Sequence, residues 1–136
     1  MPLKKLAADA NVILSAVAGK AALRVFLKED LEFVTTECIT EEVLEYLDVL
    51  SAKYGLSHEV LESQLKLLPL KIYKREFYTD FMQKAAKRMK DRDEDDVELL
   101  ALALKMKLPV WSNDSDLKSA GIDVYTTARL LKKLER

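Results

Sequence analysis

The chain has 136 residues, of which 49% are hydrophobic and 33% are charged. This length predicts a single domain (residues 1–136) that buries roughly two-thirds of its unfolded surface, and the composition is that of an ordinary soluble globular protein. The net charge of −1 excludes a general electrostatic attraction to nucleic acid.

The charges are unevenly distributed along the chain. Residues 29–62 contain ten acidic residues and one lysine, whereas residues 71–92 contain eight basic and three acidic residues. The single cysteine, Cys38, excludes an internal disulfide and suits a reducing compartment. The uncharged stretch 10–19 is too short to span a bilayer, so we expect a cytoplasmic protein with no membrane association.

The first predicted strand is Leu3–Ala8, and helices are expected at Val12–Ala18 and Ala21–Lys28. Asp9 therefore lies at the C-terminal end of a strand, which is the edge where ligands bind in open α/β sheets. The alternative is purely structural, since Asp9 or Asn11 can cap the N-terminus of the following helix.

A second strand is predicted at Leu31–Thr35, followed by a helix at Glu41–Ala52 with Thr40 as its cap. Glu42 lies beside the apolar stripe of this helix and near its start, so it can reach over the edge of the sheet. Helical periodicity alone does not favour Glu42 over Glu41.

The middle of the chain predicts a helix at Ser57–Leu68, a short strand at Leu70–Tyr73 and a helix at Phe77–Met89. The only histidine, His58, is expected to be a surface residue. The polar side of the last helix carries three basic residues that are candidates for binding RNA phosphates: Lys84, Lys87 and Arg88.

The segment from Lys90 to Leu117 contains two acidic clusters. The first has five acids within six residues: Asp91, Asp93, Glu94, Asp95 and Asp96. A capping box with Asp93 as cap and Asp96 in the first turn explains two of them, but five adjacent acids repel one another. The helix that follows is apolar on nearly every side from Leu99 to Leu104, which predicts deep burial.

The second cluster follows the next strand, Val110–Trp111, which begins after Pro109 and ends in a turn containing Asp114 and Asp116. Trp111 is expected in the core. A last strand at Ile122–Tyr125 precedes a helix at Ala128–Leu134 capped by Thr126. Strands that alternate with helices predict an α/β fold, a three-layer α/β/α sandwich with a short, mainly parallel central sheet.

In such a sheet four acids fall at one edge: Asp9, Glu42, Asp96 and Asp114, with Asp116 two residues further on. Carboxylates that gather this closely repel unless a cation lies between them. Oxygen ligands of this kind suit Mg²⁺ or Mn²⁺, and such ions support hydrolysis of phosphodiesters. The sequence shows no serine–histidine or cysteine–histidine pairing and no glycine-rich phosphate loop.

These motifs resemble the PIN-domain nucleases, especially small prokaryotic members that include toxins of VapC-type toxin–antitoxin pairs. The resemblance covers nearly the whole chain and is carried by four segments in order: Asp9–Ser15, Thr40–Leu44, Asp95–Ala103 and Trp111–Leu117. No single segment is specific to this family, but the order and spacing of the four segments together are a specific signal.

The resemblance implies that Asp9, Glu42, Asp96 and Asp114 are catalytic and coordinate Mg²⁺ or Mn²⁺, with Asp116 as an auxiliary ligand. Asn11 and Ser112 would be the supporting polar residues of the family, and Asp93, Glu94 and Asp95 offer further oxygen ligands beside Asp96. It also implies single-stranded RNA as substrate, a homodimer and, for toxin members, a small antitoxin protein as partner.

Three alternatives remain open. A haloacid-dehalogenase-like phosphohydrolase needs Asp-x-Asp, but Asn11 occupies the second position. A receiver domain needs a lysine after its last strand, where Thr126 and Thr127 stand instead. A catalytically inactive PIN-like module would bind RNA or protein without cutting, yet such a surface would gain stability by losing its mutually repelling acids.

Overall fold

The computed structural model describes residues 3–89 and 93–135, with the backbone only at 115, 116 and 119. Its centre is a five-stranded sheet in the order β3-β2-β1-β4-β5, in which all neighbouring strands are parallel. The strands are β1 (Lys5–Ala8), β2 (Glu32–Thr36), β3 (Leu70–Tyr73), β4 (Val110–Trp111) and β5 (Val124–Tyr125).

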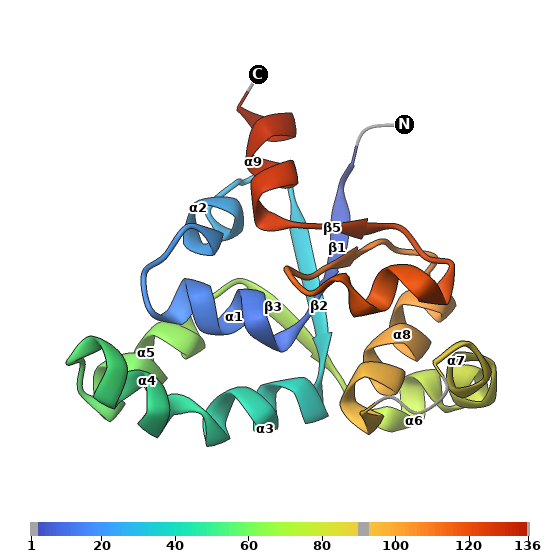
Figure 1. Ribbon diagram of the computed structural model, residues 1–136, viewed down its shortest axis with the longest axis horizontal. Helices are drawn as coiled ribbons and strands as arrows, with labels where there is room; N and C mark the ends of the chain where they lie inside the picture. The colour runs from blue at the N-terminus through green and yellow to red at the C-terminus, as the bar shows by residue number, and fades with distance from the viewer. Residues whose placement is uncertain (1–2, 90–92, 136) are drawn as a thin grey trace.

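Helices cover both faces of this sheet (Figure 1). One layer contains α1 (Ala10–Val17), α2 (Ala22–Phe26), α3 (Glu37–Glu45), α4 (Leu47–Tyr54), α5 (His58–Leu67) and α9 (Thr127–Leu134). The other layer is built around α8 (Glu94–Met106), which packs against α6 (Arg75–Tyr78), the 3₁₀ helix η1 (Thr79–Phe81) and α7 (Met82–Arg88). A second 3₁₀ helix, η2 (Ser115–Ala120), joins β4 to β5. The predicted α/β/α sandwich is confirmed.

The core explains why these short strands are stable. β1 and β2 are buried almost throughout, as expected for parallel strands covered on both faces. Trp111 is fully buried, and its ring lies 4.7 Å from that of Phe26 and 5.4 Å from that of Phe33, measured between centroids. Its indole Nε1 donates a hydrogen bond of 3.0 Å to Oγ1 of Thr127. The prediction that Trp111 belongs to the core is confirmed.

One helix begins earlier than the sequence suggested. The prediction that Thr40 caps a helix at 41–52 is wrong, because α3 starts at Glu37 and Thr36 caps it by accepting a hydrogen bond from the amide of Ile39 (3.1 Å). The Thr40 hydroxyl instead donates to the carbonyl of Glu37. Glu42 consequently lies in the second turn of α3, and the segment breaks at Tyr46 before α4 begins.

The predicted helix over Phe77–Met89 is also corrected, since α6, η1 and α7 replace it. Tyr78 is fully buried and donates a 2.6 Å hydrogen bond to the carboxylate of Glu98 on α8, so Tyr78 rather than Phe77 faces the core. Phe77 stays 39% exposed. The four-residue repeat of apolar side chains therefore does not describe one continuous helix.

Other boundaries agree with prediction. Ser57 caps α5 and Thr126 caps α9, each by accepting a backbone amide hydrogen bond at 3.1 Å. The central part of α8 is buried as expected. In the part of the chain that the structure describes, no helix is both long and apolar enough to cross a membrane.

Candidate metal centre

The strand order reverses between β1 and β4, which are neighbours in the sheet although Ala8 and Val110 are 102 positions apart in the sequence. In open α/β sheets, ligands bind outside the carboxyl ends of the strands at this switch point. Asp9 follows β1 directly and Asp114 lies three residues after β4. The first predicted acid and the last are therefore brought to one edge of the sheet by topology.

Asp9 is both a helix cap and a buried carboxylate. Only 6% of the residue is exposed, and one oxygen accepts the amide of Ala10 at 2.8 Å. The other oxygen accepts the hydroxyl of Ser112 at 2.8 Å and the side-chain amide of Asn11 at 3.2 Å. Burial raises the pKa of Asp9, the nearby charge of Asp114 adds to this, and the hydrogen bonds oppose it. The capping and ligand roles of Asp9 are thus compatible.

Asn11 and Ser112 join the start of α1 to the loop after β4. The Asn11 amide nitrogen donates to the Ser112 hydroxyl oxygen (3.0 Å), which also accepts the amide of Asp114 (3.1 Å). The Asn11 carbonyl oxygen accepts the amide of Asn113 (3.0 Å), and the Asn113 side chain accepts the amide of Thr127 (2.8 Å). The two predicted supporting residues therefore position Asp9 relative to Asp114.

Asp96 brings α8 to the same edge. Burial and, in decreasing order, the charges of Asp9, Asp93 and Asp114 together raise the pKa of Asp96 to about 6. Asp93 caps the helix, as predicted, by accepting the amide of Asp95 (3.0 Å). Asp96, Asp9 and Asp114 thus form one group whose charges act on one another.

Glu42 completes this group from α3. Burial is the largest cause that raises its pKa to about 7, followed by a carboxyl–carboxyl hydrogen bond with Asp95, the charge of Asp95 and the charge of Asp9. Although the boundary of α3 was wrongly predicted, its second turn still brings Glu42 to the cluster. We refer to Asp9, Glu42, Asp96 and Asp114 as the acidic rim.

Sequence reasoning named Asp95 as a further oxygen ligand, but it missed that Cys38 and Glu98 lie beside Asp95. Cys38, Asp95 and Glu98 each place a potential ligand atom within 4.8 Å of the others. Burial, opposed by Thr36, raises the pKa of the Cys38 thiol to about 12, so the thiol stays protonated and is a poor metal ligand. Asp95 and Glu98 supply the carboxylate oxygens of this group, and their three-residue spacing on α8 was the available signal.

The remaining predicted residues lie on α7 or have side chains outside the described part of the structure. Lys84, Lys87 and Arg88 are exposed on α7, and Nη1 of Arg88 donates to the carbonyl of Ala120 at 3.3 Å. The side chain of Asp116 lies outside the described part of the structure.

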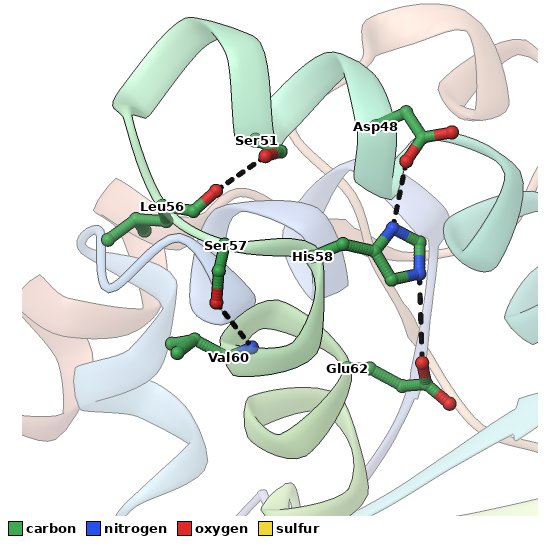
Figure 2. A network of polar contacts seen from close by, with 7 residues as sticks. All are labelled: Asp48, Ser51, Leu56, Ser57, His58, Val60 and Glu62. Atoms are coloured by element: carbon green, nitrogen blue, oxygen red, sulfur yellow. Dashed lines mark hydrogen bonds and ion pairs between the residues drawn. The ribbon is translucent and has the colours of Figure 1, made fainter.

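His58 is a surface residue, as expected. Its Nδ1 lies 2.8 Å from the carboxylate of Asp48 on α4 and its Nε2 lies 3.6 Å from that of Glu62 on α5 (Figure 2). The imidazole therefore joins α4 to α5, and neither of these helices carries a residue of the acidic rim.

His58→Ala should leave nuclease activity within about twofold and lower the free energy of unfolding by less than about 1 kcal/mol, the usual range for exposed ion pairs. Chemical denaturation and a cleavage assay measure the two effects. A large loss of activity at unchanged stability would instead give His58 a catalytic role.

Ser112→Ala should weaken metal affinity or activity by roughly 10- to 100-fold, because groups that orient a ligand carboxylate have effects of this size. The substitution removes the hydroxyl that donates to Asp9 and accepts the amide of Asp114. Isothermal titration with Mn²⁺ measures it, and Ser112→Thr, which keeps a hydroxyl, is the matched control. Equal affinity of the alanine and threonine variants would contradict this role.

The donor set of the acidic rim suits a divalent cation by its chemistry, although no three of its four described carboxylates have oxygen atoms within 4.8 Å of one another, as the ligand atoms of Cys38, Asp95 and Glu98 are. All side chains of the rim are carboxylates, and the pKa values of Glu42 and Asp96 are raised by burial and by the charges of neighbouring carboxylates, Asp9 among them. A cation among them removes this repulsion, and oxygen-only ligands favour Mg²⁺ or Mn²⁺. Asp9, Asp96 and Asp114 are the residues that would hold it.

Comparison with known proteins places the chain in a family. A family model described as "PIN domain" matches residues 8–135, and the chain therefore belongs to the PIN-domain family. Members of this family are generally nucleases and usually use divalent metal ions.

A solved structure named "Toxin-antitoxin complex from Klebsiella pneumoniae" has a similar fold, with a TM-score of 0.65 and 18% identity over 90% of this chain and 97% of the other. No curated protein matches this sequence.

Proposed function

We propose that this protein is a Mg²⁺- or Mn²⁺-dependent endoribonuclease that hydrolyses phosphodiester bonds of cytoplasmic RNA. The observation that supports this most strongly is the position of Asp9 after β1 and Asp114 after β4 at the switch point of the sheet, where their charges also act on Asp96 of α8. Membership of a family of nucleases supports the same reaction class.

In this proposal Asp9, Asp96 and Asp114 hold the metal, with Asp116 as an auxiliary ligand. A bound divalent cation supplies Lewis acidity and lowers the pKa of water at the scissile phosphate. Glu42, whose pKa of about 7 lies near physiological pH, is suited to accept a proton from the attacking water. The exposed bases Lys84, Lys87 and Arg88 would bind RNA phosphates.

The direct test is cleavage of single-stranded RNA by purified protein after EDTA treatment and on titration with Mg²⁺ or Mn²⁺. We expect no cleavage in EDTA and activity restored by either ion. A single-stranded DNA of the same sequence separates RNA from DNA specificity. Binding of RNA without cleavage at any metal concentration would favour the catalytically inactive module.

A more specific proposal is that the protein is the toxin of a type II toxin–antitoxin pair and forms a homodimer. The fold it shares with a chain of a toxin–antitoxin complex supports this. Expression of the chain alone should arrest growth, and co-expression of a short neighbouring open reading frame should restore it. Light scattering measures the mass of the purified chain, and a monomeric mass would overturn the homodimer.

A further inference from the structure

A cavity lined by basic residues lies at the edge of the sheet opposite to the acidic rim. The N-terminal ends of parallel strands meet there, so residues at or before the starts of β1, β4 and β5 come together with the last turn of α9. They enclose a cavity of about 430 Å³, which is within the size range of small-ligand sites. Four lysines line it: Lys4, Lys5, Lys107 and Lys133.

The charge of this cavity contrasts with that of the whole protein. Four lysines and one acid, Asp123, give its lining a formal charge of +3 (4 − 1), whereas the chain carries −1. Lys5 lies 3.4 Å from Glu32, but Lys4, Lys107 and Lys133 form no ion pair with any residue in the described ranges. Like charges gathered around a hollow favour an anion within it.

The backbone at Lys107 supports a role for its side chain. Lys107 ends α8 in the left-handed conformation, with φ 58° and ψ 47°, and no other non-glycine residue of the described chain has a positive φ. Glycine is the residue that adopts this conformation without strain at the end of a helix. A lysine here keeps an ammonium group at the mouth of the cavity.

The other walls indicate what accompanies the anionic group. Leu3, Leu108 and Pro109 form an apolar surface beside Tyr125, whose ring is covered on one side by the guanidinium of Arg129 at 4.1 Å. Flexible ammonium groups from separate elements suit a phosphate, which offers oxygens in several directions, whereas planar carboxylates are matched best by the fork of an arginine.

We propose that this cavity, which we call the basic pocket, binds the phosphate of a nucleotide, with the apolar wall beside the nucleoside. The phosphate belongs either to a free mononucleotide or to a single strand of RNA. The pocket does not overlap the acidic rim, because β1 alone separates Lys4 from Asp9 by roughly 15 Å at the usual strand rise. Phosphate binding here is independent of cleavage.

The experiment measures fluorescence anisotropy of a labelled single-stranded oligoribonucleotide with the complete chain in EDTA, where no cleavage is expected. The pocket variant is Lys107→Gly with Lys133→Ala. The control is Lys66→Ala with Lys132→Ala, which removes the same charge from exposed lysines that do not line the cavity. Lys132 is the sequence neighbour of Lys133 on α9.

We expect the pocket variant to bind at least about fivefold more weakly than wild type. The slope of log affinity against log salt concentration should become shallower by about 0.7 for each RNA phosphate that the variant no longer binds. The control should stay within about twofold. Lys107→Gly should not lower the melting temperature, because glycine relieves the left-handed strain. If the double variant unfolds, Lys133→Ala and Lys132→Ala are compared singly.

Competition identifies the source of the phosphate. Displacement of the probe by AMP assigns the pocket to free nucleotides, whereas displacement by unlabelled oligoribonucleotide alone assigns it to an RNA strand. Equal affinities of pocket and control variants overturn the proposal, as does displacement by oligoglutamate at the concentrations at which nucleotides act. A protein that binds in this way but never cleaves RNA contradicts the proposed function and leaves the pocket standing.

Discussion

Asp96→Asn is expected to reduce RNA cleavage by at least about 100-fold, because loss of a ligand carboxylate should exceed the 10- to 100-fold effect of groups around it. The fold should be retained. Asp96 is half-buried among Asp9, Asp93 and Asp114, whose charges raise its pKa, so a neutral amide of the same shape relieves repulsion in the metal-free protein. Steady-state cleavage with Mn²⁺ and thermal unfolding in EDTA measure the two effects.

Glu94→Gln is the matched control, since Glu94 lies in the same first turn of α8. Its carboxylate is exposed and only 3.7 Å from Arg75, so its removal should leave cleavage within about twofold. Asp95→Asn separates the role of Asp95 from that of Asp96, because Asp95 contacts Glu42 rather than Asp9. If Asp96→Asn unfolds the protein while Glu94→Gln does not, Asp96 is structural and the metal assignment fails.

The placement of Asp9 and Asp114 at one edge of the sheet was predictable, because topology alone brings the ends of neighbouring parallel strands together. Asp9 and Asp114 each follow a strand, and parallel neighbours place their carboxyl ends at one edge. The five acids around the start of α8 are more than a helix cap requires. Asp96 could therefore be predicted to add a third carboxylate to the group formed by Asp9 and Asp114. No detailed packing was needed for this inference.

The start of α3 was not predictable from periodicity. Thr36 and Thr40 are each followed by glutamate one residue later, so both satisfy the preference for a helix cap. The choice depends on where β2 ends, and its pairing continues as far as Thr36 opposite Tyr73. Register with a neighbouring strand is a tertiary property, which a local pattern does not contain.

The position of Glu98 beside Asp95 was difficult to predict from the sequence for a related reason. Tyr78 turns inward to donate to Glu98 and thereby interrupts the expected helix. A buried tyrosine requires a hydrogen-bond acceptor, but the sequence does not say which of many acids supplies it. The contact also orients the face of α8 that carries Asp95.

In the metal-free protein, the melting temperature should be higher at pH 5 than at pH 8, by roughly 5 °C for a domain of this size. Glu42 and Asp96 have pKa values of about 7 and about 6 in the folded state, above their ordinary values of 4.5 and 3.8. Since the folded state holds these protons more tightly, their contribution to stability is complete below about pH 4 and is lost as the pH rises through 6 and 7.

A divalent cation should reverse this dependence, because it binds the ionised carboxylates and stabilises the folded state by mass action. Addition of millimolar Mn²⁺ should therefore raise the melting temperature more at pH 8 than at pH 5. The double variant Glu42→Gln with Asp96→Asn should lose both the pH effect and most of the Mn²⁺ effect. If the metal-free wild type were instead more stable at pH 8, the acids would not repel one another. The electrostatic argument for a shared cation would then fail.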